Sequence, residues 1–414
     1  MSAGRLLSRR ELLRAAVLGT SGIVLAACGS QLATSVPPTA TPSNTEPAAT
    51  PPPTATPTLA PTDTPAPTKP PLRQRIARLL IVGFRGLTVS PDDPIAQAIS
   101  DDGLGGVILF DHDEIVGVRN VQSPDQVAQL VDSLRLLAPG RELIVSIDQE
   151  GGLITRLSPK YGFPAVESEA AIGPKGDTAV DAWAKGIVAT LESVGVNLNF
   201  APVVDLNVNP TNPAIGALHR AFSADPRVVG RDAEIETEAH RNKGIKTALK
   251  HFPGLGSATA NTDFGVADVT RTWHEVELDP YKDLLGRMLV DVIMAAHVVN
   301  GQIDPHAPAS LSHATVTALL RQQLGWQGVV VTDDMGAAAI KTVFGLKDAI
   351  GLALNAGNDL LLFANTHDYD EHLATKVIDV IEGLVNDGTV HESRIDEAFG
   401  RVTALFDGPG ANPG

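Results

Sequence analysis

The sequence of 414 residues contains only one cysteine, Cys28, so no intramolecular disulfide can form. It also lacks a membrane-spanning segment near its N-terminus, because the apolar run at 15–27 is shorter than the ~20 residues that a bilayer-crossing helix needs. Basic residues are in the minority, and the formal net charge is −16. Nucleic acid is therefore not an expected partner, since phosphate binding requires a basic face. Neither metal-ligand spacing nor a phosphate-cradling loop is present, so no metal and no cofactor are expected.

The N-terminal residues indicate export. Residues 1–27 combine a basic segment that contains Arg9 and Arg10, an apolar run and a small-residue box, which is typical of a secretory signal. The arginine pair favours the twin-arginine route over general secretion. The box LAAC resembles the lipobox of bacterial lipoproteins, which implies that Cys28 becomes a lipidated N-terminus; a buried thiol is the alternative. We therefore expect an extracytoplasmic protein that contacts the membrane through a lipid anchor.

The segment that follows predicts a tether. Between residues 35 and 71 the chain is almost entirely Pro, Thr and Ala, which leaves too little apolar surface to fold. Such a chain favours extended polyproline II at ~3.1 Å per residue, so it could hold a domain on the order of 100 Å from a membrane. This reach would suit work in a cell wall, although a spacer without a particular target fits equally well. Removal of residues 1–27 would take away three net positive charges and leave −19.

The rest of the chain predicts a single α/β domain over residues 72–408, followed by a short tail at 409–414. Short apolar runs alternate with longer amphipathic segments that favour helices, among them 123–137, 177–195 and 312–325. The eight candidate strands are 78–84, 105–110, 143–150, 196–206, 245–252, 291–299, 328–334 and 358–363. Eight strand-helix units of this size favour a (β/α)8 TIM-type barrel, with a doubly wound open sheet as the alternative.

Polar side chains follow the ends of successive predicted strands. Carboxylates, cations and histidines stand there in turn, namely Asp148, Glu150, Asp205, Lys250, His251, His297, Asp333 and Asp334. Any one carboxylate alone could be a helix cap or a loop anchor. In a barrel, however, all of these positions converge on one mouth, and together they predict a pocket for a ligand with many hydroxyl groups.

Five ordered motifs carry a family resemblance. IDQEGGLITRL, GVNLNFAPVVDL, KHFPGLG, AAHV and GWQGVVVTDDMG resemble the successive motifs of glycoside hydrolase family 3, particularly its bacterial single-domain β-N-acetylglucosaminidases. The likeness runs from about residue 74 to 407, and it leaves no room for the second α/β domain of many β-glucosidases in that family.

The resemblance implies roles for six residues. Those that hold sugar hydroxyls would be Asp148, Arg156, Arg220, Lys250 and His251. The aspartate that opens the VTDD stretch, Asp333, would be the nucleophile. This role agrees with elementary chemistry, because a carboxylate among Lys and Arg side chains stays ionised, as attack on an anomeric carbon requires.

The loop after KHFPG departs from the family. Its N-acetylglucosaminidases carry an Asp-Ser-His triplet where this chain has Asn261, Thr262 and Asp263, so a carboxylate replaces the acid/base histidine. A carboxylic acid can protonate a leaving group when its pKa is raised, so we predict Asp263 as the acid/base and Asn261 as loop support. The alternative is that Asp263 only caps a turn. Leu153 and Leu255 likewise replace an arginine and a histidine of the family.

The sequence thus predicts a membrane-tethered, retaining, exo-acting β-glycosidase, foremost a β-N-acetylhexosaminidase that acts on wall-derived amino sugars and takes part in peptidoglycan turnover. Its expected partner is a carbohydrate substrate, and a monomer is expected. Two alternatives remain: a β-glycosidase for another sugar, and a non-catalytic glycan-binding lipoprotein.

Overall fold

The computed structural model describes residues 69–113, 115–366 and 368–408. The predicted signal peptide, Cys28, nearly all of the predicted tether and the predicted tail lie outside the described residues. None of the helices in the described ranges combines the length and the apolar character that membrane crossing requires.

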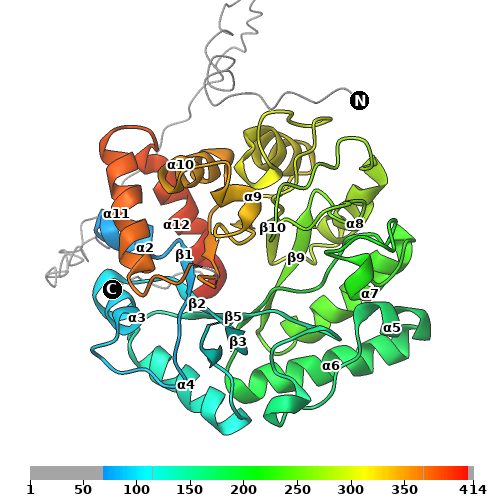
Figure 1. The fold of residues 1–414 in the computed structure, drawn as a ribbon, viewed down its shortest axis with the longest axis horizontal. Helices are drawn as coiled ribbons and strands as arrows, with labels where there is room; N and C mark the ends of the chain where they lie inside the picture. The colour runs from blue at the N-terminus through cyan, green and yellow to red at the C-terminus, as the bar shows by residue number, and fades with distance from the viewer. Residues whose placement is uncertain (1–68, 114, 367, 409–414) are drawn as a thin grey trace, which may run out of the picture. The chain divides into compact units, whose positions relative to one another are not determined.

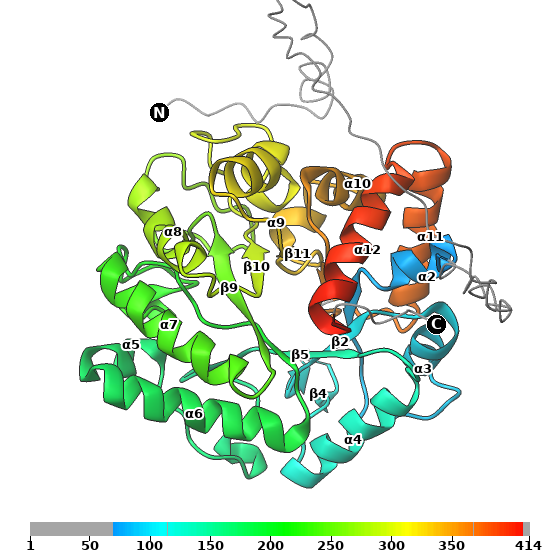
Figure 2. The ribbon, with the colours of Figure 1, turned by 180° about the vertical axis from the view of Figure 1, so that it is seen from behind.

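Eight parallel strands form the centre of the domain, as Figures 1 and 2 show from opposite sides. They are β1 (Leu80–Gly83), β2 (Gly106–Leu109), β5 (Ile144–Ile147), β8 (Leu198–Asn199), β9 (Lys246–Phe252), β10 (Val292–Ala295), β11 (Val329–Thr332) and β12 (Leu361–Phe363). Their order is β11-β10-β9-β8-β5-β2-β1-β12, and a parallel bridge between Val331 and Leu360 joins the two outer strands. The predicted TIM-type barrel is confirmed, and the doubly wound alternative is wrong.

Helices surround this sheet, so its strands are buried on both faces. The α-helices are α2 (Leu72–Ala77), α3 (Pro94–Gln97), α4 (Pro124–Leu136), α5 (Glu169–Ile172), α6 (Asp177–Val194), α7 (Pro226–Arg241), α8 (Asp279–Gly286), α9 (Ala338–Lys341), α10 (Leu346–Ala356), α11 (Leu373–Asn386) and α12 (Glu392–Phe406). The π-helical segments are η2 (Ala98–Asp102) and η8 (Ala314–Gln323), and 3-10 turns lie at η3 (Pro159–Tyr161), η4 (Gly173–Lys175), η5 (Gly216–Leu218), η6 (Glu275–Leu278) and η7 (Ala309–Leu311). Burial on both faces explains why the strands appear in the sequence as continuous apolar runs rather than as alternating patterns.

Helix ends follow local sequence rules. The Ser123 hydroxyl accepts a hydrogen bond from the Gln126 N–H at the start of α4, and Asp225 does the same for Arg227 at the start of α7. In both helices a proline occupies the first position, where its missing N–H has no partner to lose. Gly195 ends α6 in the left-handed region, at φ 76°, which other residues rarely adopt.

The fourth predicted strand is shorter than expected. The prediction covered 196–206, whereas β8 contains two residues. Beyond it, Val203 forms a bridge with Lys250, and the carbonyls of Ala201 and Pro202 still accept backbone hydrogen bonds from β9. Pro202 explains part of the difference, since proline has no N–H to give to a sheet. The predicted helix at 312–325 is present as η8, with π-helical hydrogen bonding.

Two small hairpins extend from the carboxyl ends of the strands. β3 (His112–Asp113) pairs with β4 (Gly117–Val118) after β2, and β6 (Gln149–Gly151) pairs with β7 (Ile154–Thr155) after β5. Both belong to the strand-to-helix loops, where barrels carry their ligand sites.

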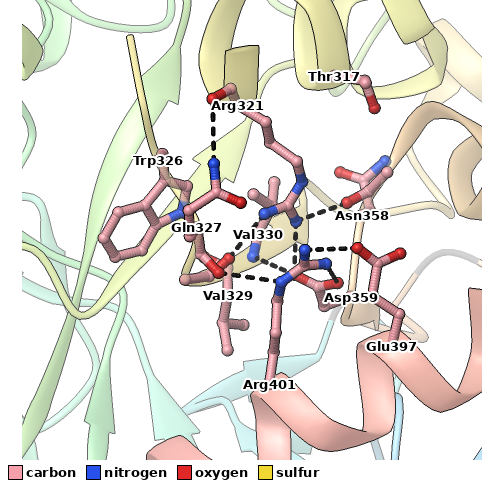
Figure 3. A network of polar contacts seen from close by, with 12 residues as sticks. Thr317, Arg321, Trp326, Gln327, Val329, Val330, Asn358, Asp359, Glu397 and Arg401 are labelled. Carbon is pink, nitrogen blue, oxygen red and sulfur yellow. Dashed lines mark hydrogen bonds and ion pairs between the residues drawn. The ribbon is translucent and has the colours of Figure 1, made fainter. Parts of the chain in front are cut away.

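A buried ion cluster holds the amino end of the barrel, where Asp359 precedes β12. Figure 3 shows Arg321 and Arg401 directed toward this carboxylate, which also accepts from Arg394. The three nearest N···O distances are 2.7, 3.1 and 2.6 Å respectively, and the Val330 N–H donates to the same group at 3.0 Å. The cluster connects η8, β11 and α12 beside the bridge between the outer strands, so it stabilises the seam of the barrel.

The described chain begins at the same end. Lys69 and Arg75 pair with Glu392 and Asp396 of α12, and Arg78 donates to both oxygens of Asp407 at 2.9 and 3.0 Å. These contacts fix α2 against the C-terminal helix.

Candidate active site

A pocket of about 250 Å³ opens at the carboxyl ends of the barrel strands. This volume lies just below the ~300–1,000 Å³ of typical small-molecule sites, which favours a ligand of limited size. The pocket wall contains every predicted catalytic and sugar-binding residue: Asp148, Arg156, Arg220, Lys250, His251, Asn261, Asp263 and Asp333. The structure therefore brings together residues that lie up to 185 positions apart in the sequence, from Asp148 to Asp333.

Lys250, at the end of β9, is the centre of a buried charge cluster. Its ammonium lies 2.9 Å from Asp148 and 2.5 Å from Glu150, and only 2% of the side chain is exposed. Burial alone would raise the pKa of Glu150, but the charges of Arg220 and Lys250 outweigh it and lower that pKa to about 2. Burial likewise opposes ionisation of Asp148, yet Lys250 and Arg156 hold its pKa well below the usual value. Both carboxylates are therefore ionised and can accept hydrogen bonds from hydroxyl groups.

Arg220 and His251 continue the cluster. Two guanidinium nitrogens of Arg220 donate to the two oxygens of Glu150, each at 2.8 Å. His251 contacts Asp205 through Nδ1 at 2.6 Å, and because a carboxylate only accepts, that nitrogen carries a proton. Its Nε2 then faces Arg220 at 3.4 Å. A fixed imidazole orientation at the pocket wall is the result.

The structure gives roles to two residues that the sequence identified only as strand-end carboxylates. Glu150 positions Lys250 and Arg220, and Asp205 positions His251 while also accepting from the Leu255 N–H at 2.6 Å. Neither lines the pocket, so they support the wall without being part of it. The DQEGG and VVDL motifs carried a signal for both, but only the folded barrel shows their partners.

Two further buried carboxyls, Glu169 and Glu236, affect the charge near Glu150. Burial raises the pKa of Glu169 well above its usual range, and the charge of Glu236 adds to this effect. Burial also raises the pKa of Glu236, with a further contribution from Glu150. Burial and mutual repulsion therefore favour a proton on at least one of the two, so the pair adds less negative charge to the cluster than two carboxylates would.

Asp333 follows β11 directly, and one of its oxygens accepts from the Asp334 N–H at 2.8 Å. The Asp334 carboxyl accepts from the N–H groups of Ala364 at 2.8 Å and Gly336 at 3.0 Å. His297 donates from Nε2 to the Asp334 carbonyl at 2.8 Å. Asp334 and His297 therefore shape the turn that presents Asp333 to the pocket.

The loop with Asp263 lies against this turn. The Asn261 side chain accepts from the Asp263 N–H at 2.9 Å, which makes Asn261 the turn former of the loop. The carbonyls of Thr262 and Asp263 accept from Ala339 and Ala338 at 3.1 and 3.3 Å, at the start of α9. The loop is thus hydrogen bonded to the segment that follows Asp333.

Asp263 and Asp333 also interact through their charges. Desolvation raises the pKa of Asp263, and the negative charge of Asp333 raises it further. Asp263 stays exposed at the rim, so water screens part of this effect. The direction of the shift is the one that a general acid requires, because a higher pKa increases the share of Asp263 that carries a proton; the catalytic roles of Asp263 and Asp333 remain predictions.

The two leucines that depart from the family have different positions. Leu255 is buried and lines the pocket, so it adds apolar surface near the ligand. Leu153 lies in the turn between β6 and β7, is 66% exposed and does not line the pocket.

Among the residues at 69–113, 115–366 and 368–408, no three His, Cys, Asp or Glu side chains are arranged to hold a metal ion.

The chain is similar in sequence to one family of known proteins. The model of the glycosyl hydrolase family 3 N-terminal domain matches residues 71–405. The chain is 34% identical over 296 residues to a β-hexosaminidase of Shewanella frigidimarina, which covers 69% of this chain and 82% of that protein. It is 31% identical over 347 residues to β-hexosaminidase A of Pseudoalteromonas piscicida. That match includes 77% of this chain but only 56% of the relative's length.

Solved structures give the same fold. A family 3 β-N-acetylglucosaminidase from Paenibacillus superposes with a TM-score of 0.75 and 33% identity, over 84% of this chain and 64% of that one. A β-N-acetylhexosaminidase from Beutenbergia cavernae superposes with a TM-score of 0.73 and 31% identity, over 81% of this chain and 98% of that one.

Proposed function

The chain belongs to glycosyl hydrolase family 3, and on this premise we propose that it is a retaining exo-β-glycosidase that releases terminal β-linked N-acetylglucosamine. The observation that carries the proposal is the position of two carboxyls, Asp333 and Asp263, on the wall of one pocket beside the Lys250 cluster. The names of the β-hexosaminidase relatives support a hexosaminide as the substrate, and the name of the similar Paenibacillus β-N-acetylglucosaminidase supports the choice of sugar.

Binding of the sugar would use the charged wall. Asp148 accepts hydrogen bonds from hydroxyl groups, whereas Lys250 and Arg156 donate to their oxygens. The limited volume of the pocket suits one terminal sugar, in agreement with exo action.

The first chemical step forms a bond between a carboxylate oxygen of Asp333 and the anomeric carbon. The bond from that carbon to the leaving oxygen breaks, and Asp263 gives its proton to this oxygen. The raised pKa of Asp263 supports this role, because a carboxyl with a higher pKa is more often protonated and so better able to donate.

The second step reverses the roles. Once Asp333 is esterified its negative charge is gone, so the pKa of Asp263 falls and its carboxylate can accept a proton from water. The water oxygen bonds to the anomeric carbon, the ester bond to Asp333 breaks, and Asp263 is protonated again. Anionic Asp263 would repel phosphate, so water is the preferred acceptor.

The decisive experiment measures turnover of aryl β-glycosides that differ only in the sugar. We expect the N-acetylglucosaminide to be the best substrate and Asp333→Asn to lower kcat/KM at least ~10³-fold with an unchanged melting temperature. Asp132→Asn, at an exposed position of α4, is the matched control. Preference for another glycoside would select the alternative specificity, and glycan binding without turnover would make the protein a carbohydrate-binding lipoprotein.

We further propose that the protein is exported and held at the membrane. Cys28 would carry the lipid after removal of residues 1–27, and the Pro/Thr-rich segment would act as the tether. Wall-derived glycans are then the accessible substrates. This proposal depends on residues outside those that the structure describes.

A further inference from the structure

A second cavity, of about 310 Å³, lies next to the reaction pocket. Helices α9, α10 and α11 and the end of β12 form it, and Figure 1 shows α9 and α10 side by side at the barrel. Most of its wall is apolar, with Met335, Ile340, Phe344, Leu346, Phe363 and Leu373. This composition contrasts with the charged reaction pocket, so the second cavity would accept a hydrocarbon group and not a sugar.

The two cavities share part of their walls. Asp334 and Thr366 line both, and Asp334 is adjacent in sequence to Asp333. Two backbone N–H groups hold the Asp334 carboxyl in place. The second cavity therefore borders the reaction pocket at the residue that follows Asp333.

The loop with Asp263 indicates which part of a substrate lies on this side. Its carbonyls bond to the first N–H groups of α9, and Ile340 of the same helix lines the second cavity. The leaving oxygen must approach Asp263 to be protonated, so the leaving group lies on the α9 side of the pocket. At the outer edge, Lys341 pairs with Asp368 at 2.7 Å and provides a polar border.

We propose that the second cavity is a subsite for an apolar substituent of the leaving group, an alkyl chain or an aromatic ring. This inference rests on the proposed function of the neighbouring pocket. It makes Phe344 and Leu346, both half-buried in the wall, determinants of leaving-group specificity.

The test uses the full chain and the methyl, propyl and pentyl β-N-acetylglucosaminides. Each methylene that leaves water should raise kcat/KM about fourfold until the cavity is filled, so the pentyl glycoside should exceed the methyl one at least ~10-fold. Leu346→Ser should lower this pentyl-to-methyl ratio several-fold, and Phe344→Ala should do so independently. Leu352→Ser is the matched control, because Leu352 lies on the same helix, is 40% exposed and does not line the cavity.

Calorimetric titration of Asp333→Asn with the same glycosides separates this inference from the proposed function. If the wild type hydrolyses none of them, the proposed function fails, but affinity that rises with chain length and is lost on adding Leu346→Ser still supports the subsite. The inference is overturned if chain length changes neither kcat/KM nor affinity, or if Leu346→Ser and Leu352→Ser give the same ratio.

Discussion

Replacement of Lys250 by methionine tests the charge cluster at the base of the active site. The substitution keeps the length and the apolar stem of the side chain but removes the ammonium between Asp148 and Glu150. Both carboxylates are largely buried, so neither can recover its lost partner from bulk water. We expect a loss of folding free energy together with a loss of activity.

The contacts of the cluster set the size of the effect. Removal of one partner from a buried ion pair costs about 3–5 kcal/mol. Arg156 remains 3.5 Å from Asp148, and Arg220 keeps both of its 2.8 Å contacts to Glu150, so the cost should lie at the lower end. About 3 kcal/mol corresponds to a decrease of roughly 4 °C in the melting temperature of a domain of this size.

The pH dependence follows from the lowered carboxylate pKa values. A group whose folded pKa lies below its unfolded value stabilises the fold above the unfolded pKa and loses this contribution as the pH falls through the folded pKa. With the pKa of Glu150 at about 2 in the fold, the difference between wild type and Lys250→Met should be full near neutral pH. It should decrease between the ordinary glutamate pKa of 4.5 and about 2.

Thermal unfolding followed by circular dichroism measures this difference, with kinetics alongside. Because Lys250 also holds the sugar in the proposed function, KM should rise and kcat should fall. Lys246→Met is the control, since Lys246 starts the same strand, is partly exposed and does not line the pocket. Equal melting temperatures for the two variants, or a difference that does not change with pH, would refute the buried-cluster reasoning.

Three other perturbations address the acid/base, the seam and the anchor. Asp263→Ala should lower kcat/KM for an alkyl glycoside ~10²–10⁴-fold but spare bond cleavage in a dinitrophenyl glycoside, whose leaving group needs no proton, and azide should restore turnover. Since burial and the charge of Asp333 raise the pKa of Asp263, the basic limb of the pH profile of kcat/KM should lie above the ordinary carboxyl range in the wild type and vanish in this variant. Equal losses of activity on both substrates, without rescue by azide, would assign the proton to another group. Asp359→Asn should cost about 3–5 kcal/mol of folding free energy. It should leave KM unchanged, because the cluster of Arg321, Arg394 and Arg401 lies at the end of the barrel opposite the pocket. Glu397→Gln, at a half-exposed position, is the control, and a changed KM in Asp359→Asn would contradict a purely structural role. Cys28→Ala should leave an unprocessed or soluble precursor in cell fractionation, whereas unchanged processing and membrane association would exclude the lipid anchor.

The sequence predicts the strands well because their signal is local. A parallel strand covered on both faces needs a continuous apolar run, and each of the eight runs contains one strand of the barrel. The exception is the run at 196–206, where regular pairing ends after Asn199 and the chain around Pro202 keeps one bridge, at Val203, and isolated backbone hydrogen bonds.

The partners within the site could not be predicted in the same way. Glu150 and Arg220 are 70 residues apart, and His251 and Asp205 are 46 residues apart. No periodicity encodes such pairs, because they depend on how far each strand extends before its loop begins. The bond of the Asp263 carbonyl to α9 is of the same kind, and so is the apolar cavity behind Asp334.

The ion pairs between α2 and α12 place the start of the described domain, at Lys69, beside the amino ends of the strands. The reaction pocket opens at their carboxyl ends, on the opposite face. Lys69 and the opening of the pocket therefore lie on opposite faces of the domain. A label or cross-linker attached to the Lys69 side chain would leave the opening free for glycans.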